Sequence, residues 1–364
     1  MKKQKYSLEQ LGWNSGFENQ LISFSNYKNY LIGRIISINH SIYTVISEHG
    51  ESLTALDGKL KLAIKQSKIE IPAVGDWVII KNYKHNSQVI TQILKRFSSL
   101  YRNTCGKKTN KQIIAANIDY IFIISGLDQD FNIRRLERYV TMAWESGARP
   151  VIVLNKSDII NLEQLSAIKS QVECITTGVS VHMISALKNI GIEQLTQYLQ
   201  TGKTVALIGS SGCGKSTLVN RLLGSNRQKT NSIRESDGRG RHTTVRRDLF
   251  ILENSGIIID NPGLREIQLY AEQVALDMTF SDIEELARNC KYNDCSHQSE
   301  PGCTVQQALL DGDLMPDRYA SYLKLQKELA FLKNRKLGKK SSFHKTISKY
   351  SKELKKYKKQ NGQF

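Results

Sequence analysis

The sequence has no long hydrophobic run. A helix that crosses a membrane needs about 20 consecutive apolar residues, and no uninterrupted apolar stretch of this chain approaches that length. The first residues, MKKQKYSLEQLGWNSGF, carry the positive charges of a secretory signal peptide without the apolar core that follows such charges. We therefore expect a cytoplasmic protein with no membrane partner.

Acidic residues are few relative to basic ones. The 364-residue chain contains 52 Lys and Arg against 34 Asp and Glu, which gives a formal net charge of +18. Residues 333–364 hold twelve of the basic residues and a single acidic one, Glu353. Such a block attracts polyanions, and nucleic acid is the commonest of them. A solvated basic helix and an acidic membrane surface are the alternatives for charge alone.

Cysteines are also few, and half of them lie close together. Cys290, Cys295, His297 and Cys303 form the pattern C-x4-C-x-H-x5-C. Three thiols and an imidazole are the ligands that tetrahedral Zn²⁺ takes in closed structural sites. Unpaired cysteines and a redox pair are the alternatives, but in a cytoplasmic chain this cluster favours one structural zinc ion.

The periodicity of the apolar residues divides the chain into five regions. A polar N-terminal arm, either loose or a short helix, is expected at 1–30. Five short apolar stretches follow at 31–97: LIGRIISI, YTVIS, ESLTAL, GDWVII and QVITQIL. Five short strands in so few residues predict a small β-barrel of OB-like or SH3-like type, and we expect the OB-like form.

Strands and helices alternate in the third region, residues 98–275. Strands are predicted at 118–125, 149–158, 181–186, 203–209, 248–252 and 256–263, and helices at 132–147, 162–172, 191–200 and 214–224. This alternation predicts a parallel α/β sheet with ligands at the carboxyl ends of the strands. A mainly helical zinc-binding domain at 276–332 and a basic tail at 333–364 complete the expected multidomain fold.

A phosphate-binding loop follows the strand TVALI and opens a helix. It comprises Gly209, Ser210, Ser211, Gly212, Cys213, Gly214, Lys215, Ser216 and Thr217. The glycines let backbone N–H groups surround phosphates, Lys215 reaches the outer phosphates, and the Ser216 hydroxyl ligates Mg²⁺. This pattern predicts a nucleoside triphosphate without choosing its base. Cys213 is interpreted as a residue small enough for the loop rather than as a reactive thiol.

A guanine-reading segment, NKSD, lies 209 − 155 = 54 residues before this loop instead of after it. The Asp158 carboxylate accepts the two donors of guanine, Asn155 ties the loops together, and the Lys156 stem lies along the purine plane. Ser185 and Ala186 end the next strand, where a backbone N–H can contact the guanine carbonyl. Because all these segments end strands of one sheet, GTP is favoured over ATP.

Magnesium binding and hydrolysis are assigned to the segments after the phosphate loop. Asp260 holds Mg²⁺ through water, the Gly263 N–H meets the terminal phosphate, and Thr243 or Thr244 completes the metal shell. The residue after DNPG is Leu264, which cannot orient water. Intrinsic hydrolysis should therefore be slow, with His242 as the candidate for orienting water and a partner-supplied group as the alternative.

These motifs together resemble a known family. The order NKSD, SA, GSSGCGKS, GRGRHTT and DNPG, with a barrel before it and the Cys/His cluster after it, closely resembles the circularly permuted ribosome-biogenesis GTPases of the ribosome small-subunit-dependent GTPase A family. Two residues depart from the family pattern: Cys213, where we expect Val, and Asn261, where we expect Thr or Ser. Neither side chain is expected to take part in phosphate binding or hydrolysis.

The resemblance implies a GTPase that acts in late maturation of the small ribosomal subunit. It implies slow GTP hydrolysis to GDP and phosphate that the subunit stimulates, a catalytic histidine at the position of His242, and rRNA contacts through the barrel and the zinc domain. We expect a monomer. The alternative is a nucleotide-gated RNA-binding or chaperone protein in which hydrolysis is incidental. The NKSD segment and the absence of a helicase-like motif argue against a third interpretation, an ATPase acting on nucleic acid.

Overall fold

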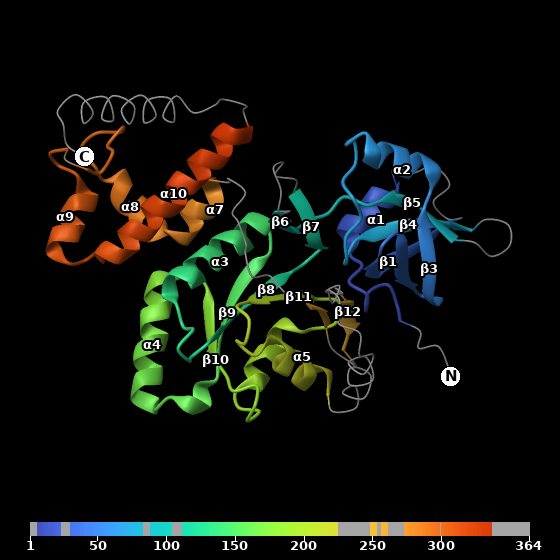
Figure 1. The fold of residues 1–364 in the computed structure, drawn as a ribbon, viewed down its shortest axis with the longest axis horizontal. Helices are drawn as coiled ribbons and strands as arrows, with labels where there is room; N and C mark the ends of the chain where they lie inside the picture. Colours follow the sequence, from blue (N-terminus) through green and yellow to red (C-terminus); the bar gives the residue numbers. More distant parts are fainter. Residues whose placement is uncertain are drawn as a thin grey trace, which may run out of the picture. The chain divides into compact units, whose positions relative to one another are not determined.

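The computed structural model describes residues 6–22, 30–82, 88–103, 111–224, 248–252, 256–260, 273–298 and 300–336. The chain divides into two compact units, Met1–Gln268 and Leu269–Phe364. The first unit contains a β-barrel and an α/β sheet, and the second is helical (Figure 1). The sequence-predicted architecture is confirmed.

Five strands near the N-terminus close into a barrel. They are β1 (Leu31–Asn39), β2 (Ile42–Ser47), β3 (Gly50–Leu56), β4 (Trp77–Asn82) and β5 (Gln88–Ile93). The pairing order is β1-β2-β3-β5-β4, and β4 pairs back to β1. The helix α2 (Gly58–Lys65), which the sequence did not predict, begins at Asp57, whose side chain accepts a hydrogen bond from the Lys59 N–H. Leu60 of α2 packs against the barrel interior with Ile35 and Val78.

The described part of the N-terminal arm, residues 6–22, is packed rather than loose. Helix α1 (Ser15–Ile22) buries Phe17 and Leu21. These residues and Leu11 form a cluster with Trp77, which is fully buried in the barrel wall. The short helix is thus the correct one of the two alternatives for this segment, because its apolar residues cover one outer face of the barrel.

A mostly parallel sheet follows the hairpin of β6 (Ser99–Asn103) and β7 (Lys111–Ala116). Its strands are β8 (Tyr120–Gly126), β9 (Arg149–Asn155), β10 (Ser180–Met183), β11 (Thr204–Gly209), β12 (Asp248–Ile251) and β13 (Ile257–Asp260). They lie in the order β10-β9-β8-β11-β13-β12, and of these strands only β12 runs antiparallel to its neighbour β13. The pair Ser37 and Asp248 joins β12 to β1, so the barrel and the α/β sheet are continuous.

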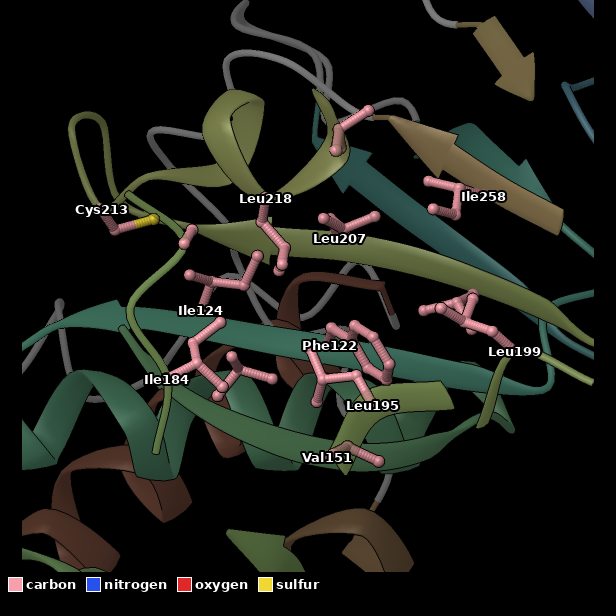
Figure 2. Close-up of a cluster of buried hydrophobic side chains, with 14 of the residues drawn as sticks. Phe122, Ile124, Val151, Ile184, Leu195, Leu199, Leu207, Cys213, Leu218 and Ile258 are labelled. Carbon is pink, nitrogen blue, oxygen red and sulfur yellow. The ribbon is translucent and has the colours of Figure 1, made fainter. Parts of the chain in front are cut away.

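Helices pack on this sheet through its alternating residues. Phe122 and Leu207 meet Leu218 of α5 (Lys215–Leu223) and Leu195 in a buried cluster (Figure 2). Helices α3 (Ile133–Ser146) and α4 (Leu162–Ile175) contact β8, β9 and β10. α3 starts at Asn132, whose side chain accepts from the Arg135 N–H, and stops at Gly147, whose φ of 83° suits glycine.

The helix predicted at 191–200 is a 3-10 helix. It is η4 and spans Ile192–Tyr198. A 3-10 helix rises about 2.0 Å per residue against about 1.5 Å for an α-helix. The seven residues therefore reach farther along the sheet between Gly191 and β11 while still burying Leu195.

The second unit contains α7 (Gln273–Thr279), α8 (Ser281–Arg288), α9 (Thr304–Asp311) and α10 (Pro316–Lys336). Arg318 of α10 pairs with Asp282 of α8 at 2.6 Å and lies 4.7 Å from the ring centroid of Phe280. Among the described residues, no helix has the length and apolar content needed to cross a membrane.

Candidate functional site

The predicted nucleotide-binding segments follow the carboxyl ends of β9, β10 and β11. β9 ends at Asn155 and is followed by Lys156 and by Asp158, which is exposed. β11 ends at Gly209, and the phosphate loop runs from there to helix α5. The predicted segments therefore meet at one edge of the sheet, although 54 residues separate NKSD from the loop (209 − 155).

Asn155 connects three of these segments and is buried. Its side-chain Nδ2 donates to the Cys213 carbonyl at 2.8 Å, and its Oδ1 accepts from the Ala186 N–H at 2.9 Å. One amide thus joins the base-reading strand, the Ser185-Ala186 segment and the phosphate loop. The predicted tying role of Asn155 matches this geometry. The Ala186 N–H is already hydrogen-bonded to Asn155, so a guanine contact from this segment stays a prediction.

Two glycines of the phosphate loop have steric reasons to be glycine. A Cβ on Gly214 would lie 2.1 Å from the Asn155 Nδ2, and its φ is +97°. A Cβ on Gly209 would lie 2.2 Å from the Ile124 carbonyl oxygen. Both contacts are too short for any side chain, so the loop can approach β8 and Asn155 only with glycine at these positions.

The rest of the phosphate loop divides into interior and surface residues. Cys213 is 2% exposed and belongs to the core cluster under α5, so its thiol faces the protein interior (Figure 2). The Lys215 ammonium donates to the carbonyls of Gly209 at 2.8 Å and Ser210 at 2.5 Å. Lys215 is therefore held over the concave side of the loop, where a phosphate would contact it. The exposed residues of the loop are Ser211, Gly212, Ser216 and Thr217.

Asp260 ends β13, the neighbour of β11, and pairs in register with Leu207. Burial raises the pKa of Asp260, while Lys215 opposes this shift and Asp248 adds to it. A divalent cation next to the carboxylate would favour its ionised form. Asp260 ends β13, and Ser216 lies in the first turn of α5, which the phosphate loop connects to the neighbouring strand β11. His242, Thr243, Thr244 and Gly263 lie outside the described residues.

Three residues that sequence reasoning missed support the site. Arg221 of α5 donates to the carbonyls of Ala186 at 3.1 Å and Leu187 at 2.9 Å. Asp128 pairs with Lys156, which lowers the pKa of Asp128. Hydrogen bonds from Ser210 and Arg135 lower the pKa of Asp130. Both acids come directly after a buried strand, and that position was the available signal.

The Cys/His cluster of the second unit has the dimensions of a metal site. The ligand atoms of Cys290, Cys295, His297 and Cys303 all lie within 4.8 Å of one another. The His297 Nδ1 lies 3.5 Å from the sulfurs of Cys290 and Cys303, and these sulfurs lie 3.9 Å apart. A tetrahedral ion with Zn–S of about 2.3 Å and Zn–N of about 2.0–2.1 Å would separate its ligands by about 3.5–3.8 Å. The donor set therefore fits Zn²⁺.

The protein around the cluster holds the ligand loop in shape. The Gln306 Nε2 and the Tyr319 hydroxyl both donate to the His297 carbonyl, the latter at 3.0 Å. Glu300 accepts from the N–H groups of Ser296 and Gln298 at 3.0 Å. Hydrogen bonds from Ser296 lower the pKa of Glu300 to about 2, so this carboxylate is ionised at neutral pH.

The fold and the site define a P-loop GTP-binding protein with permuted motif order, and comparisons with known proteins agree. The family model for RsgA GTPase matches residues 93–270. A Listeria innocua protein named small ribosomal subunit biogenesis GTPase RsgA 1 is 42% identical over 324 residues, covering 89% of this chain and 90% of its own. A Methanosarcina acetivorans protein named small ribosomal subunit biogenesis GTPase RsgA is 41% identical, covering 96% and 93%.

Solved structures show the same fold. The crystal structure of YjeQ from Thermotoga maritima has a TM-score of 0.62 at 26% identity, covering 83% of this chain and 99% of that one. A structure described as YloQ, a circularly permuted GTPase, has a TM-score of 0.60 at 24% identity, covering 86% and 98%. The model for ABC transporter also matches residues 192–356. That range includes the phosphate loop, which many nucleotide-binding families share.

The chain belongs to the RsgA GTPase family of ribosome-biogenesis GTPases. It is an enzyme that hydrolyses GTP, and the resemblance stated from the motif order is confirmed.

Proposed function

We propose that this GTPase acts on the small ribosomal subunit during late maturation and leaves it upon hydrolysis. The two hydrogen bonds of Asn155 are the observation that supports GTP binding in this proposal, since they bring the NKSD segment and the phosphate loop together. The printed names of the relatives support the choice of the small subunit as partner. The net charge of +18 supports contacts with rRNA, through the barrel and the zinc domain.

Each segment of the site has a proposed role toward GTP and Mg²⁺. Asp158 accepts the N1–H and the exocyclic amine of guanine, and the Lys156 stem lies along the purine. The loop amides and Lys215 hold the phosphates. Ser216 and Asp260 hold the magnesium ion, which supplies charge neutralisation on the phosphates.

The segments that complete hydrolysis are proposed from the sequence. His242 orients the attacking water, Thr243 or Thr244 completes the magnesium shell, and the Gly263 N–H meets the terminal phosphate. Leu264 follows where many GTPases have glutamine, so the unstimulated reaction is slow. The zinc ion is structural, because four protein ligands leave no open position. The protein works in the cytoplasm as a monomer.

Multiple-turnover GTP hydrolysis with and without small ribosomal subunits tests the proposal. A large stimulation by subunits is expected, and His242→Ala should then remove most of the stimulated rate while preserving GDP affinity. Flat, slow turnover together with tight GTP binding would support the second candidate, a nucleotide-gated RNA-binding protein. Leu264 is the observation that favours this second candidate, because it supplies no group that can orient water.

A further inference from the structure

The loop at 127–132 follows strand β8 and belongs to none of the nucleotide-binding motifs. β8 lies between β9 and β11 in the sheet. Because the three strands are parallel, the loop leaves the sheet between the base-reading segment and the phosphate loop. It is therefore placed to contact both halves of the nucleotide site.

Asp128 of this loop contacts the base-reading lysine directly. Its carboxylate pairs with the Lys156 ammonium, and the two side chains are 31% and 32% exposed, respectively. The Lys156 backbone has a φ of 67°, in the left-handed region that residues other than glycine seldom adopt. The lysine is thus constrained at its backbone by the turn after β9 and at its tip by Asp128.

The carboxylate of Asp128 is itself held in place. Its Oδ1 accepts from the Asp130 N–H at 3.1 Å, and its carbonyl accepts from the Phe131 N–H at 2.9 Å. The Leu127 N–H donates to the Asn155 carbonyl at 2.8 Å, which fixes the start of the loop to the end of β9. These hydrogen bonds hold the loop in place independently of the ion pair with Lys156.

The same loop also reaches the phosphate loop. The Asp130 carboxylate lies near the Ser210 side chain, which lowers the pKa of Asp130, and pairs with Arg135 of α3 at 2.8 Å. Asp128 and Asp130 therefore face different halves of the nucleotide site. Only Asp128 contacts a residue that is proposed to touch the base.

We infer that Asp128 is a positioning residue for the guanine nucleotide. It holds the Lys156 side chain so that its stem lies along the plane in which the purine ring binds. Ordering a free lysine side chain costs conformational entropy, so a lysine that is already held loses less of it when the ring binds. The negative charge of Asp128 also holds the Lys156 ammonium beside the carboxylate, so that the apolar stem of the lysine stays available to contact the purine ring. This inference rests on the role proposed above for Lys156.

Asp128→Asn isolates the charge of the carboxylate. An asparagine Oδ1 can still accept from the Asp130 N–H, so the loop keeps its hydrogen bond while Lys156 loses its ion partner. Calorimetric titration with GDP should show binding weakened by about two- to fivefold, the scale of an exposed ion pair. Inosine diphosphate, which lacks the exocyclic amine, should be weakened by the same factor, because the lysine stem contacts the ring plane.

A double-mutant comparison separates lysine positioning from a general loop effect. In a Lys156→Met background, adding Asp128→Asn should cause no further loss of GDP affinity. Glu173→Gln is the matched control, because Glu173 pairs with Lys169 at 3.7 Å on the exposed side of α4, outside the site. It should leave GDP affinity at the wild-type value.

The outcomes distinguish this inference from the proposed function. If wild-type protein binds ADP as tightly as GDP, the proposed guanine recognition by Asp158 and Lys156 is contradicted, whatever the effect of Asp128→Asn. Wild-type protein that selects GDP, with an Asp128→Asn variant of unchanged affinity, would overturn only the positioning role. The same holds if the loss caused by Asp128→Asn persists at full size in the Lys156→Met background.

Discussion

At the scale of single residues, one amide organises the nucleotide site. Asn155 is 3% exposed and hydrogen-bonds two segments that lie 58 and 31 residues away in the sequence. Gly214 must be glycine because the Asn155 amide occupies the space of its Cβ. The base reader and the phosphate loop are therefore coupled through direct contact and not only through a shared ligand.

Asn155→Ala should weaken both folding and nucleotide binding. The variant leaves the Cys213 carbonyl and the Ala186 N–H without their buried partner, which costs about 2 kcal/mol or more of unfolding free energy. GDP affinity should fall at least tenfold, because the phosphate loop is no longer held against β9. Urea unfolding and GDP titration measure the two effects.

The control for this variant is Asn82→Ala in the barrel. It removes an exposed hydrogen bond from Gln88 to Asn82 of 3.0 Å and should change neither quantity appreciably. Wild-type GDP affinity in folded Asn155→Ala protein would show that the amide does not organise the site.

At the scale of elements, a single arginine joins the barrel to the GTPase sheet. Arg34 of β1 is 1% exposed and donates to the carbonyls of Leu11 at 2.7 Å, Gly75 at 3.1 Å and Asn117 at 3.0 Å. It also donates to the hydroxyl of Thr204, the first residue of β11, at 2.9 Å. Burial lowers the pKa of Arg34 to about 10, an effect that Asp119 and Asp76 oppose, so the side chain stays charged at neutral pH.

Arg34→Met should loosen the barrel from the GTPase sheet. Methionine fills similar space but leaves the carbonyls of Leu11 and Asn117 without a donor, which costs about 2 kcal/mol or more. Trp13 and Trp77 pack together in the barrel, whereas Trp144 lies in α3, so single-tryptophan versions report on the two elements separately. Urea unfolding should show coincident transitions in the wild type and separate ones in the variant.

Arg149→Met is the matched control, since Arg149 is exposed at the start of β9. It should leave both transitions at their wild-type midpoints. Coincident, unshifted transitions in Arg34→Met protein would contradict the joining role of Arg34.

At the scale of the whole molecule, both units have buried apolar residues, and among the described residues the second unit also contains a candidate metal site. The first unit has clusters of fully buried apolar residues in the barrel and under α5. In the second unit, the segment between α8 and α9 is built around the Cys290, Cys295, His297 and Cys303 cluster. A short ligand loop with few apolar residues depends on a metal ion for its folding free energy.

Removing the metal should therefore affect the second unit alone. Treatment with a strong chelator is expected to lower helical circular dichroism as α8 and α9 lose their shared anchor, while GDP affinity of the first unit stays within about twofold. Cys295→Ser should reproduce the loss, whereas Cys174→Ser should not, because Cys174 is exposed on α4. Unchanged helicity and thermal stability after complete metal removal would contradict a structural metal.

Much of the fold could be predicted because its signals are local. The barrel strands, the helix bounded by Asn132 and Gly147, and the phosphate loop are each encoded by residues a few positions apart. The residues predicted to bind metal are likewise confined to fourteen residues, Cys290 to Cys303. A helix was predicted at 191–200 but its 3-10 form was not, because apolar spacing does not separate a 3-10 helix from a short α-helix.

The sequence by itself thus determined the family of this protein and which segments are proposed to read guanine, surround phosphates and bind metal. Only the tertiary structure decided how these segments support one another. The strand order places β8 between β9 and β11, which brings Asp128 to Lys156, and the register of the sheet brings Asn155 to the phosphate loop. Arg34 reaches Thr204 across 170 residues. Such contacts depend on how distant elements pack, and no local spacing of residues encodes that packing.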